Sequence, residues 1–286
     1  MRGGSGIRRK RRYKWRRGLA KFLKALPFWL LIGGFILIIL GMTVTVFLSA
    51  FSTHWFGTVW PAGFTVSWFV KAWSEYNIWL YFKLSLETTL IATIISLLLS
   101  VPGAYVFARK DFPLKHVLLG LYQLPFMLPE LAYALPVTAI FYKLGLAETF
   151  AGLVIVQLLV GIPFSMVILI PFIEALDPRL EMAAQSLGAN RLRMFSRIVV
   201  PQLIPGITAS AINIFIRMFG AFVVILLISG PRMQTLNVMV FSVLSATGSQ
   251  PQPMLDSLTL SLMLPLLLFT FLSMWVSRWL QRRVGK

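Results

Sequence analysis

The stretch of residues 174–207 reads EALDPRLEMAAQSLGANRLRMFSRIVVPQLIPGI and lies between two long apolar runs. Asp177 can cap a helix that begins at the proline after it, because aspartate accepts from the first turn and proline presets a helical φ. Gly188 can end this helix in the left-handed conformation that glycine tolerates. Asn190 can cap a second helix, which we expect to stop at Pro201. The stretch therefore predicts a short helix, a glycine turn and a second helix.

The first of these helices carries small apolar side chains on one face. Leu180, Ala183, Ala184 and Leu187 recur at helical spacing and predict a single apolar stripe. The two alanines would let the helix lie close to another surface, as docking into a groove on a partner protein requires. An amphipathic loop that rests on the membrane interface is the alternative, and these residues alone favour neither.

The composition indicates a membrane protein. Of the 286 residues, 58% are hydrophobic and 13% are charged, and the mean hydropathy is +0.81. Soluble domains contain about half apolar residues, whereas several runs here reach the roughly 20 residues that a helix needs to cross a bilayer. We therefore expect an all-α polytopic membrane protein with six transmembrane helices, at about 28–50, 79–108, 117–141, 151–173, 203–229 and 255–280.

Positive charge is concentrated at the N-terminus and in alternate loops. The net charge is +18, and eleven of the 27 Lys and Arg residues precede Pro27. We expect residues 1–26 to form a basic cytoplasmic tail or interfacial helix that binds anionic headgroups, and 27–286 to form the membrane domain. Its position beside an apolar run argues against nucleic acid as the partner. Because most of the loop charge falls on the same side as the tail, both termini are predicted to be cytoplasmic.

The residue inventory offers little for catalysis or metal binding. The chain has no cysteine, which excludes disulfides and thiolate metal sites, and His54 and His116 lie far apart. The acidic and histidine residues of the external loops are scattered, whereas a membrane enzyme would need them clustered. We therefore expect no catalytic residue and no metal ligand, and the chain is predicted not to be an enzyme.

The stretch at 174–207 resembles the EAA loop of permeases from binding-protein-dependent ABC importers. That family's pattern is Glu-Ala-Ala, three residues, Gly, nine residues, then Ile-x-Leu-Pro. Here Met182, Ala183 and Ala184 are followed by Gly188 at the same interval, and then by Ile198-Val-Val-Pro. Met182 replaces the glutamate for which the motif is named, and Glu181 lies one position earlier.

The resemblance extends over about 60–281 and is closest to polyamine-type permeases. Trp60-Pro61 and the residues after it are similar to the external segment of that branch. Gly230-Pro231 through Val238 resembles the family's GP…TLPV stretch, with Asn237 in place of proline. The segment around Arg217 also resembles the family's fifth span, although Ala221 replaces its acidic residue.

This resemblance implies a MetI-like permease of the type I importer class, in the inner membrane. The loop 174–202 would be the coupling helix that docks into an ATPase. The implied partners are a second permease subunit, identical or related, two cytoplasmic ATPase subunits that bind ATP and Mg, and an external solute-binding protein. No cofactor is implied in this chain, which also lacks a GxxxxGK[ST] phosphate loop. The residues implied to couple to the ATPase are Glu181, Met182, Ala183, Ala184, Leu187, Gly188, Ala189 and Arg191.

Three ionisable residues fall inside the predicted spans: Glu87, Glu130 and Arg217. Burying each unpaired would cost about 3 kcal/mol, so such residues usually have a function or a partner. They could line the transport pathway, or a Glu–Arg pair could lock spans together, which we favour for Arg217. Prolines around Glu130 suggest an opened helix and favour a pathway role there.

Two carboxylates against one guanidinium favour a cationic solute, so the expected substrate is a polyamine such as spermidine or putrescine. Ferric iron, phosphonate, thiamine, sulfate or molybdate are the alternatives within the family. An ion-coupled secondary transporter is the alternative from another class, although it should show inverted repeats, and none is visible in the sequence.

Overall fold

The computed structural model describes residues 5–55, 58–246 and 250–284, with side chains described from 27 to 275 apart from 56–57, 247–249 and 273. The side chains of the basic tail and of the C-terminal Lys and Arg residues therefore lie outside the described residues. The regular structure of the described residues is helical, and an isolated antiparallel bridge joins Ser52 to Phe64. The elements are α1 (Ser5–Ala50), α2 (Ser67–Tyr76), α3 (Ile78–Arg109), α4 (Lys115–Met127), α5 (Glu130–Lys143), α6 (Phe150–Glu174), α7 (Pro178–Ser186), α8 (Arg191–Met194), the π-helix η1 (Phe195–Val199), α9 (Val200–Phe219), α10 (Val223–Ser229), α11 (Leu236–Ser245) and α12 (Gln252–Val284).

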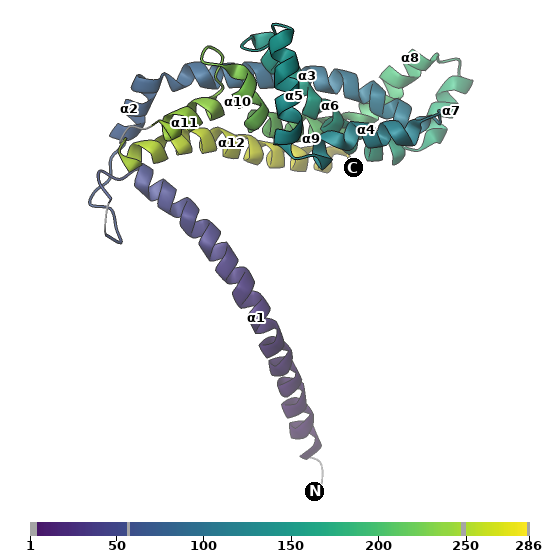
Figure 1. Cartoon of the computed structure of the whole chain (residues 1–286). Helices are drawn as coiled ribbons and strands as arrows, with labels where there is room; N and C mark the ends of the chain where they lie inside the picture. The colour runs from purple at the N-terminus through teal and green to yellow at the C-terminus, as the bar shows by residue number, and fades with distance from the viewer. Residues whose placement is uncertain (1–4, 56–57, 247–249, 285–286) are drawn as a thin grey trace.

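The long helices α3, α6, α9 and α12 run side by side along an elongated bundle, with α2 at one end and α7 and α8 at the other (Figure 1). Helix α1 contacts α12 near its C-terminal end, and its N-terminal part extends away from the bundle (Figure 1). Among the described residues, five helical segments are long and apolar enough to cross a membrane, and the bent pair of α4 and α5 gives a sixth when it is counted as one broken span. The predicted all-α fold with six spans is therefore confirmed.

Small side chains let α3 and α6 pack closely. Lipid tails are as apolar as leucine, so helices in a membrane associate through close van der Waals contact and hydrogen bonds rather than through the hydrophobic effect. On α6, a side chain at Gly161 would collide with the hydroxyl of Ser96 on α3 and with the methyl of Met218 on α9. Ser100 also donates to the carbonyl of Ile162 at 3.1 Å. The buried small residues of α3 are Ser85, Thr88, Thr89, Ala92, Thr93, Ser96, Ser100 and Ala104.

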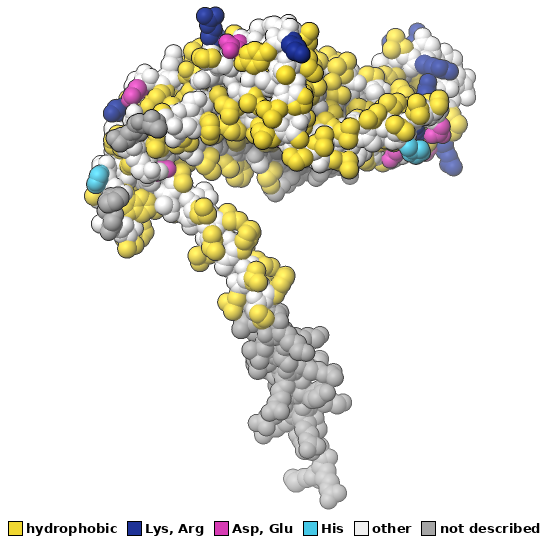
Figure 2. Space-filling view, in the orientation of Figure 1, with side chains coloured by type: hydrophobic (Ala, Val, Ile, Leu, Met, Phe, Trp, Pro, Cys, Tyr) yellow, Lys and Arg dark blue, Asp and Glu magenta, His cyan; other side chains and the backbone are white. Residues whose placement is uncertain are grey.

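Apolar side chains cover the outside of the molecule. The most apolar stretch of α1, which lies within Pro27–Ala50, contains no buried residue. This is expected of a helix that faces lipid or another subunit. Figure 2 shows hydrophobic side chains over most of the visible flank, and a cluster of Lys and Arg at the end with α7 and α8. Ser49, near the end of α1, donates to the buried carboxylate of Asp256 on α12, whose other oxygen accepts from Gln252 at 3.2 Å.

The third predicted span is not one continuous helix. It divides into α4 and α5, which meet at an angle of 100°. Leu128 has an extended backbone with ψ 142°, and Pro129 follows it. Proline lacks a donor and disfavours the helical conformation of the preceding residue, so α4 ends here and α5 begins in a new direction at Glu130.

The fifth predicted span is also interrupted, which the sequence analysis did not foresee. Helix α9 ends at Phe219 and α10 begins at Val223. The side-chain amide of Asn237 donates to the carbonyls of Phe219 and Ala221, at 2.9 and 3.1 Å. Because broken helices leave backbone acceptors unsatisfied in the membrane, Asn237 stabilises the break from a distant helix.

The variant Gly161→Val tests the close packing of α3 against α6. Its added carbons would press on Ser96 and Met218, and overpacking of this kind costs about 1–3 kcal/mol. We expect the apparent Tm of the purified protein in detergent, followed by circular dichroism, to fall by roughly 5 °C. Gly120→Val on α4 is the matched control, because a Cβ there meets no atom within 4 Å. Equal Tm values for the two variants would contradict the close-packing interpretation.

Candidate functional site

The loop at 174–202 folds as a helix, a glycine turn and a second helix, as predicted. Asp177 accepts from the backbone N–H of Arg179 at 2.9 Å and caps α7. Gly188 has φ +83°, the left-handed conformation that ends such a helix. Asn190 accepts from the N–H of Arg193 at 2.8 Å and caps α8.

The second helix of this loop does not stop at Pro201, so that prediction was wrong. Helix α8 continues through the π-helix η1 into α9. The N–H of Val200 donates to the carbonyl of Phe195, five residues back. Proline is tolerated in the first turn of a helix, and the wider π-turn changes the hydrogen-bond register just before Pro201. Backbone continuity thus links the loop to α9 through a locally widened turn.

The predicted apolar stripe of α7 divides between two sides of the helix. Ala184 is buried in a cluster that includes Ala104 and Leu169 from the bundle. By contrast, Ala183 is exposed, and the side chains of Met182 and Leu187 are 58% and 89% exposed. Of the remaining residues implied to couple to an ATPase, Gly188 and Arg191 are exposed and Ala189 is partly buried. The outward surface of α7 is therefore apolar and includes Leu180, Met182, Ala183 and Leu187.

Glu181 points toward the bundle rather than outward. The phenol of Tyr105, on α3, donates to one carboxylate oxygen of Glu181 at 2.6 Å. The guanidinium of Arg109 donates to the other oxygen at 2.9 Å and also to the carbonyl of Leu176 at 2.7 Å. Both side chains of the ion pair are largely buried.

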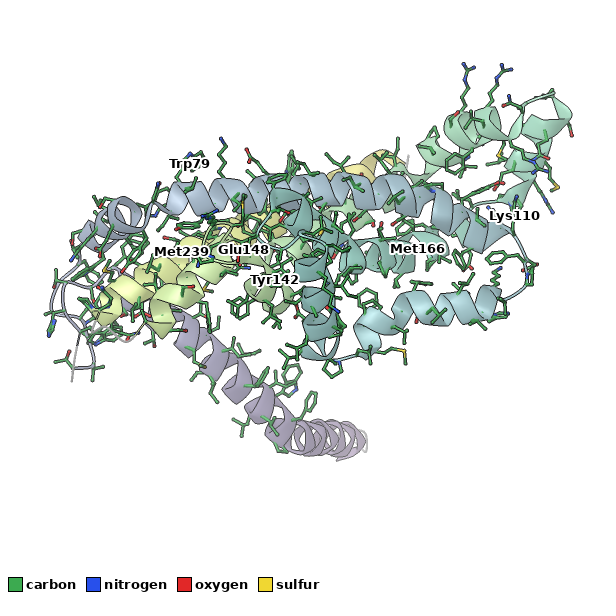
Figure 3. The ribbon with its side chains drawn as sticks, turned by 45° about the horizontal axis from the view of Figure 1, so that its top comes forward. Trp79, Lys110, Tyr142, Glu148, Met166 and Met239 are labelled. Atoms are coloured by element: carbon green, nitrogen blue, oxygen red, sulfur yellow. The ribbon has the colours of Figure 1, made fainter. Side chains whose placement is uncertain are left out.

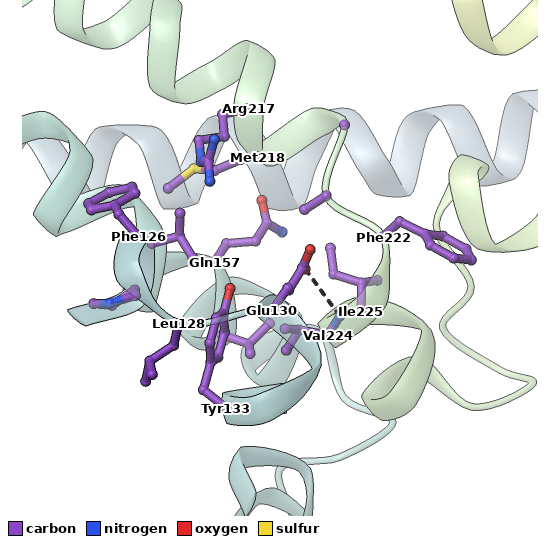
Figure 4. A pocket seen from close by; sticks show the side chains of 15 residues that line it. Phe126, Leu128, Glu130, Tyr133, Gln157, Arg217, Met218, Phe222, Val224 and Ile225 are labelled. Atoms are coloured by element: carbon purple, nitrogen blue, oxygen red, sulfur yellow. Dashed lines mark hydrogen bonds between the residues drawn. The ribbon is translucent and has the colours of Figure 1, made fainter. Parts of the chain in front are cut away.

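A cavity of about 330 Å³ lies where the two broken helices meet α6 (Figure 4). The bend between α4 and α5 forms one wall, and the break between α9 and α10 forms another. Because a broken helix frees backbone groups, such breaks in a membrane occur where protein or a water-filled cavity satisfies them. The polar side chains that line the cavity are Glu130, Tyr133, Gln157 and Arg217, and the aromatic ones include Phe126 and Phe222.

The structure brings two of the three predicted pathway residues, Glu130 and Arg217, into this cavity. Among the described residues no ion pair joins them, so the alternative of a locking Glu–Arg pair is not what the structure shows. Instead, the Arg217 guanidinium lies against the contacting rings of Phe126 and Phe164, 5.5 and 5.3 Å from their centroids. One oxygen of Glu130 receives a long hydrogen bond, 3.5 Å, from the N–H of Val224.

Gln157 is a cavity residue that the sequence analysis missed. Its side chain is buried, and its amide nitrogen donates to the carbonyl of Leu153 at 3.1 Å, while its oxygen has no protein partner. Figure 4 shows this amide extending between Arg217 and Glu130. A lone glutamine inside the apolar run of residues 150–173 was the available signal. This oxygen is a buried acceptor in a residue that lines the cavity.

Glu87 lies apart from the other two pathway candidates. It is on α3, where its carboxylate pairs with the ammonium of Lys83 at 3.8 Å, and both side chains are about half exposed. It does not line the cavity that contains Glu130 and Arg217. Its role in the pathway stays a prediction.

Comparisons with known proteins agree with this architecture. Residues 100–286 match the family model described as "Binding-protein-dependent transport system inner membrane component". The sulfate transport system permease protein CysT of Salmonella typhimurium is 29% identical, over 52% of this chain and 58% of that protein. The trehalose transport system permease protein SugB of Mycobacterium tuberculosis is 33% identical, over 46% of this chain and 48% of that protein. The chain thus spans about half the length of the curated relatives it matches.

A solved structure shows the same fold. It is a chain from a bacterial ABC transporter involved in the import of the acidic polysaccharide alginate, with a TM-score of 0.71 and 17% identity. The match covers 88% of this chain and 96% of that one. Because the family model covers more than half of the chain and the fold agrees, the chain belongs to the family of inner membrane components of binding-protein-dependent transport systems.

Proposed function

We propose that the chain is a permease subunit of an ABC importer, which forms the pathway for a small solute and is driven by separate ATPase subunits. The outward face of α7 carries this proposal. Leu187 and Met182 are exposed there on a rigidly capped helix, at the end of the molecule where Lys and Arg gather. An apolar helix face of this kind fits a groove on a soluble partner.

The proposed assembly follows from the family and from the charge distribution. A second permease subunit would complete the pathway, an external binding protein would deliver the solute, and two ATPases would bind ATP and Mg. The loop with α7 and α8 carries Arg179, Arg191, Arg193 and Arg197, so we place it in the cytoplasm together with both termini. The apolar surface of α1 fits a multi-pass protein of the inner membrane.

For the solute, we propose a small polyamine cation such as spermidine or putrescine. The support comes from the balance of free groups in the cavity. Glu130 has one long hydrogen bond and can accept from an ammonium group, and the buried oxygen of the lining residue Gln157 has no protein partner. The cation of Arg217 already makes cation–π contacts with Phe126 and Phe164.

Oxyanions are the second candidate substrate class, because a relative is named for sulfate transport. Arg217 would then bind the anion through its guanidinium N–H groups, which its contacts with the aromatic rings do not use. Ferric iron, phosphonate and thiamine are further alternatives within the family. A secondary transporter driven by an ion gradient is the alternative from another class.

The variant Gly188→Val tests the role of the loop in coupling. A β-branched side chain at φ +83° is strained, so the turn between α7 and α8 should distort. In the transporter assembled with its ATPase subunits, we expect ATP-dependent uptake to fall by about tenfold, since strain of roughly 1–2 kcal/mol would be relieved by displacing α7.

Gly145→Val is the matched control, because Gly145 also has a positive φ, +66°, and open space, but lies in the loop between α5 and α6. Equal losses of uptake in the two variants would count against a coupling role for the loop. Membrane insertion of each variant, checked by fractionation, should be unchanged.

The variant Glu130→Gln tests the solute class. A charge-assisted hydrogen bond contributes about 1.5–3 kcal/mol, so uptake of radiolabelled putrescine or spermidine at low concentration should fall by roughly tenfold or more. Glu75→Gln is the control, because Glu75 is an exposed carboxylate on α2. Glu87→Gln tests the remaining predicted pathway residue in the same assay.

Sulfate uptake is measured in parallel. Uptake of sulfate but not of polyamine by the wild-type transporter would overturn the cation assignment. Polyamine uptake that is the same in Glu130→Gln as in Glu75→Gln would remove Glu130 from the pathway.

A further inference from the structure

The carboxylate of Glu181 joins the cytoplasmic helix α7 to the end of α3. Its partners on α3 lie more than seventy positions earlier in the sequence. Its two oxygens accept from different side chains, Tyr105 at 2.6 Å and Arg109 at 2.9 Å. Arg109 also donates to the carbonyl of Leu176, in the link between α6 and α7. This polar clamp, formed by Tyr105, Arg109 and Glu181, therefore holds both α7 and the linker that precedes it.

The clamp covers an apolar contact and is shielded from water. Ala184, on the inner side of α7, is 6% exposed and packs in the same cluster as Val101 and Ala104 of α3. The ring of Tyr105 packs edge-on against that of Phe195 at 5.1 Å between centroids. The side chains of the Arg109–Glu181 pair are only 14% and 12% exposed, so salt and water screen it less than a surface pair.

The link from the same loop to α9 is of another kind. There the chain passes through the π-helix η1, a less regular helical geometry that is common at functional sites. Helix α7 is joined to α3 by a buried ion pair. Ala184 of α7 also packs in one cluster with residues of α3 and with Leu203 of α9, while the backbone connection to α9 runs through the glycine turn and η1. The ion pair is thus the charged side-chain link through which a displacement of α7 can reach α3.

Helix α3 extends from this clamp to the opposite end of the bundle. Figure 3 shows it as one continuous helix between Trp79 and Lys110. In its middle, Thr93 donates to the sulfur of Met218 at 3.8 Å, and Ser96 lies close to the methyl of Met218 at Gly161. Met218 lines the cavity next to Arg217. Helix α3 therefore contacts the cavity wall through Met218.

We propose that Glu181 is the positioning residue that fastens the coupling helix α7 to α3, so that movement of α7 enters the bundle through α3 and reaches the cavity at Met218. In this chain Glu181 serves an internal contact, while Met182 and Leu187 form the surface left for the ATPase. The first part of this inference concerns the chain alone, and the second part rests on the proposed function.

Hydrogen exchange measured by mass spectrometry on the purified chain in nanodiscs tests the first part. Glu181→Gln removes the charge that holds Arg109, so the amides of α7 should exchange about tenfold faster, while those of α9 keep their protection. Tyr105→Phe removes one hydrogen bond and should produce a smaller increase at the same amides.

Glu174→Gln is the matched control, because Glu174 is an exposed carboxylate at the end of α6 near the same loop. In Glu174→Gln, the amides of α7 should exchange at the wild-type rate. Wild-type exchange rates at α7 in both Glu181→Gln and Tyr105→Phe would overturn the clamp. This result does not depend on any ATPase, so it is distinct from a failure of the proposed transport function.

The ratio of solute imported to ATP hydrolysed tests the second part, in the complex with its ATPase subunits and with putrescine as the probe. We expect Glu181→Gln to retain ATP hydrolysis near the wild-type rate but to import about tenfold less putrescine for each ATP. A residue that only stabilised the loop would lower hydrolysis and import together. An unchanged ratio in a variant with faster α7 exchange would show that movement enters through another helix, and would overturn the proposal.

Discussion

The close packing of α3 against α6 is the contact on which the rest of the structure depends. In a membrane, apolar side chains gain little free energy by moving from lipid into a helix interface. Helices therefore associate where small residues let their backbones approach. Gly161 leaves room for Ser96 and Met218, and Ser100 adds a hydrogen bond to the backbone of α6. This pair supports both α7 and the cavity, because α3 holds α7 at one end of the molecule and touches the wall of the cavity in the middle.

Around this rigid pair, the irregular elements collect at the places where function is expected. Two predicted spans break beside the cavity, and residues from both breaks line it. Asn237 satisfies the carbonyls at one break, whereas Pro129 removes a donor at the other. A membrane protein can maintain such breaks only inside a protein or water environment, which is why they mark a pathway better than any single charge does.

Features set by neighbours in sequence could be predicted, and features set by distant contacts could not. Asp177, Gly188 and Asn190 act within one helical turn, so the helix caps and the glycine turn of the loop could be predicted from the sequence. The break after Phe219 depends on Asn237, eighteen residues away, and no local signal showed it. Likewise, the spacing of the loop motif placed Glu181 among the coupling residues, but only the fold shows that it binds Arg109. Charge alone placed Glu87 with Glu130, and the structure separates them.

The source of energy for transport is the most direct test of the central conclusion. The chain is reconstituted in liposomes with its ATPase subunits and binding protein, and putrescine uptake is measured with ATP, with a non-hydrolysable ATP analogue, and with ion gradients alone. We expect uptake with ATP, none with the analogue, and none by the chain alone under any gradient. Uptake by the chain alone, driven by a proton or sodium gradient, would contradict the assignment as an ATP-driven permease.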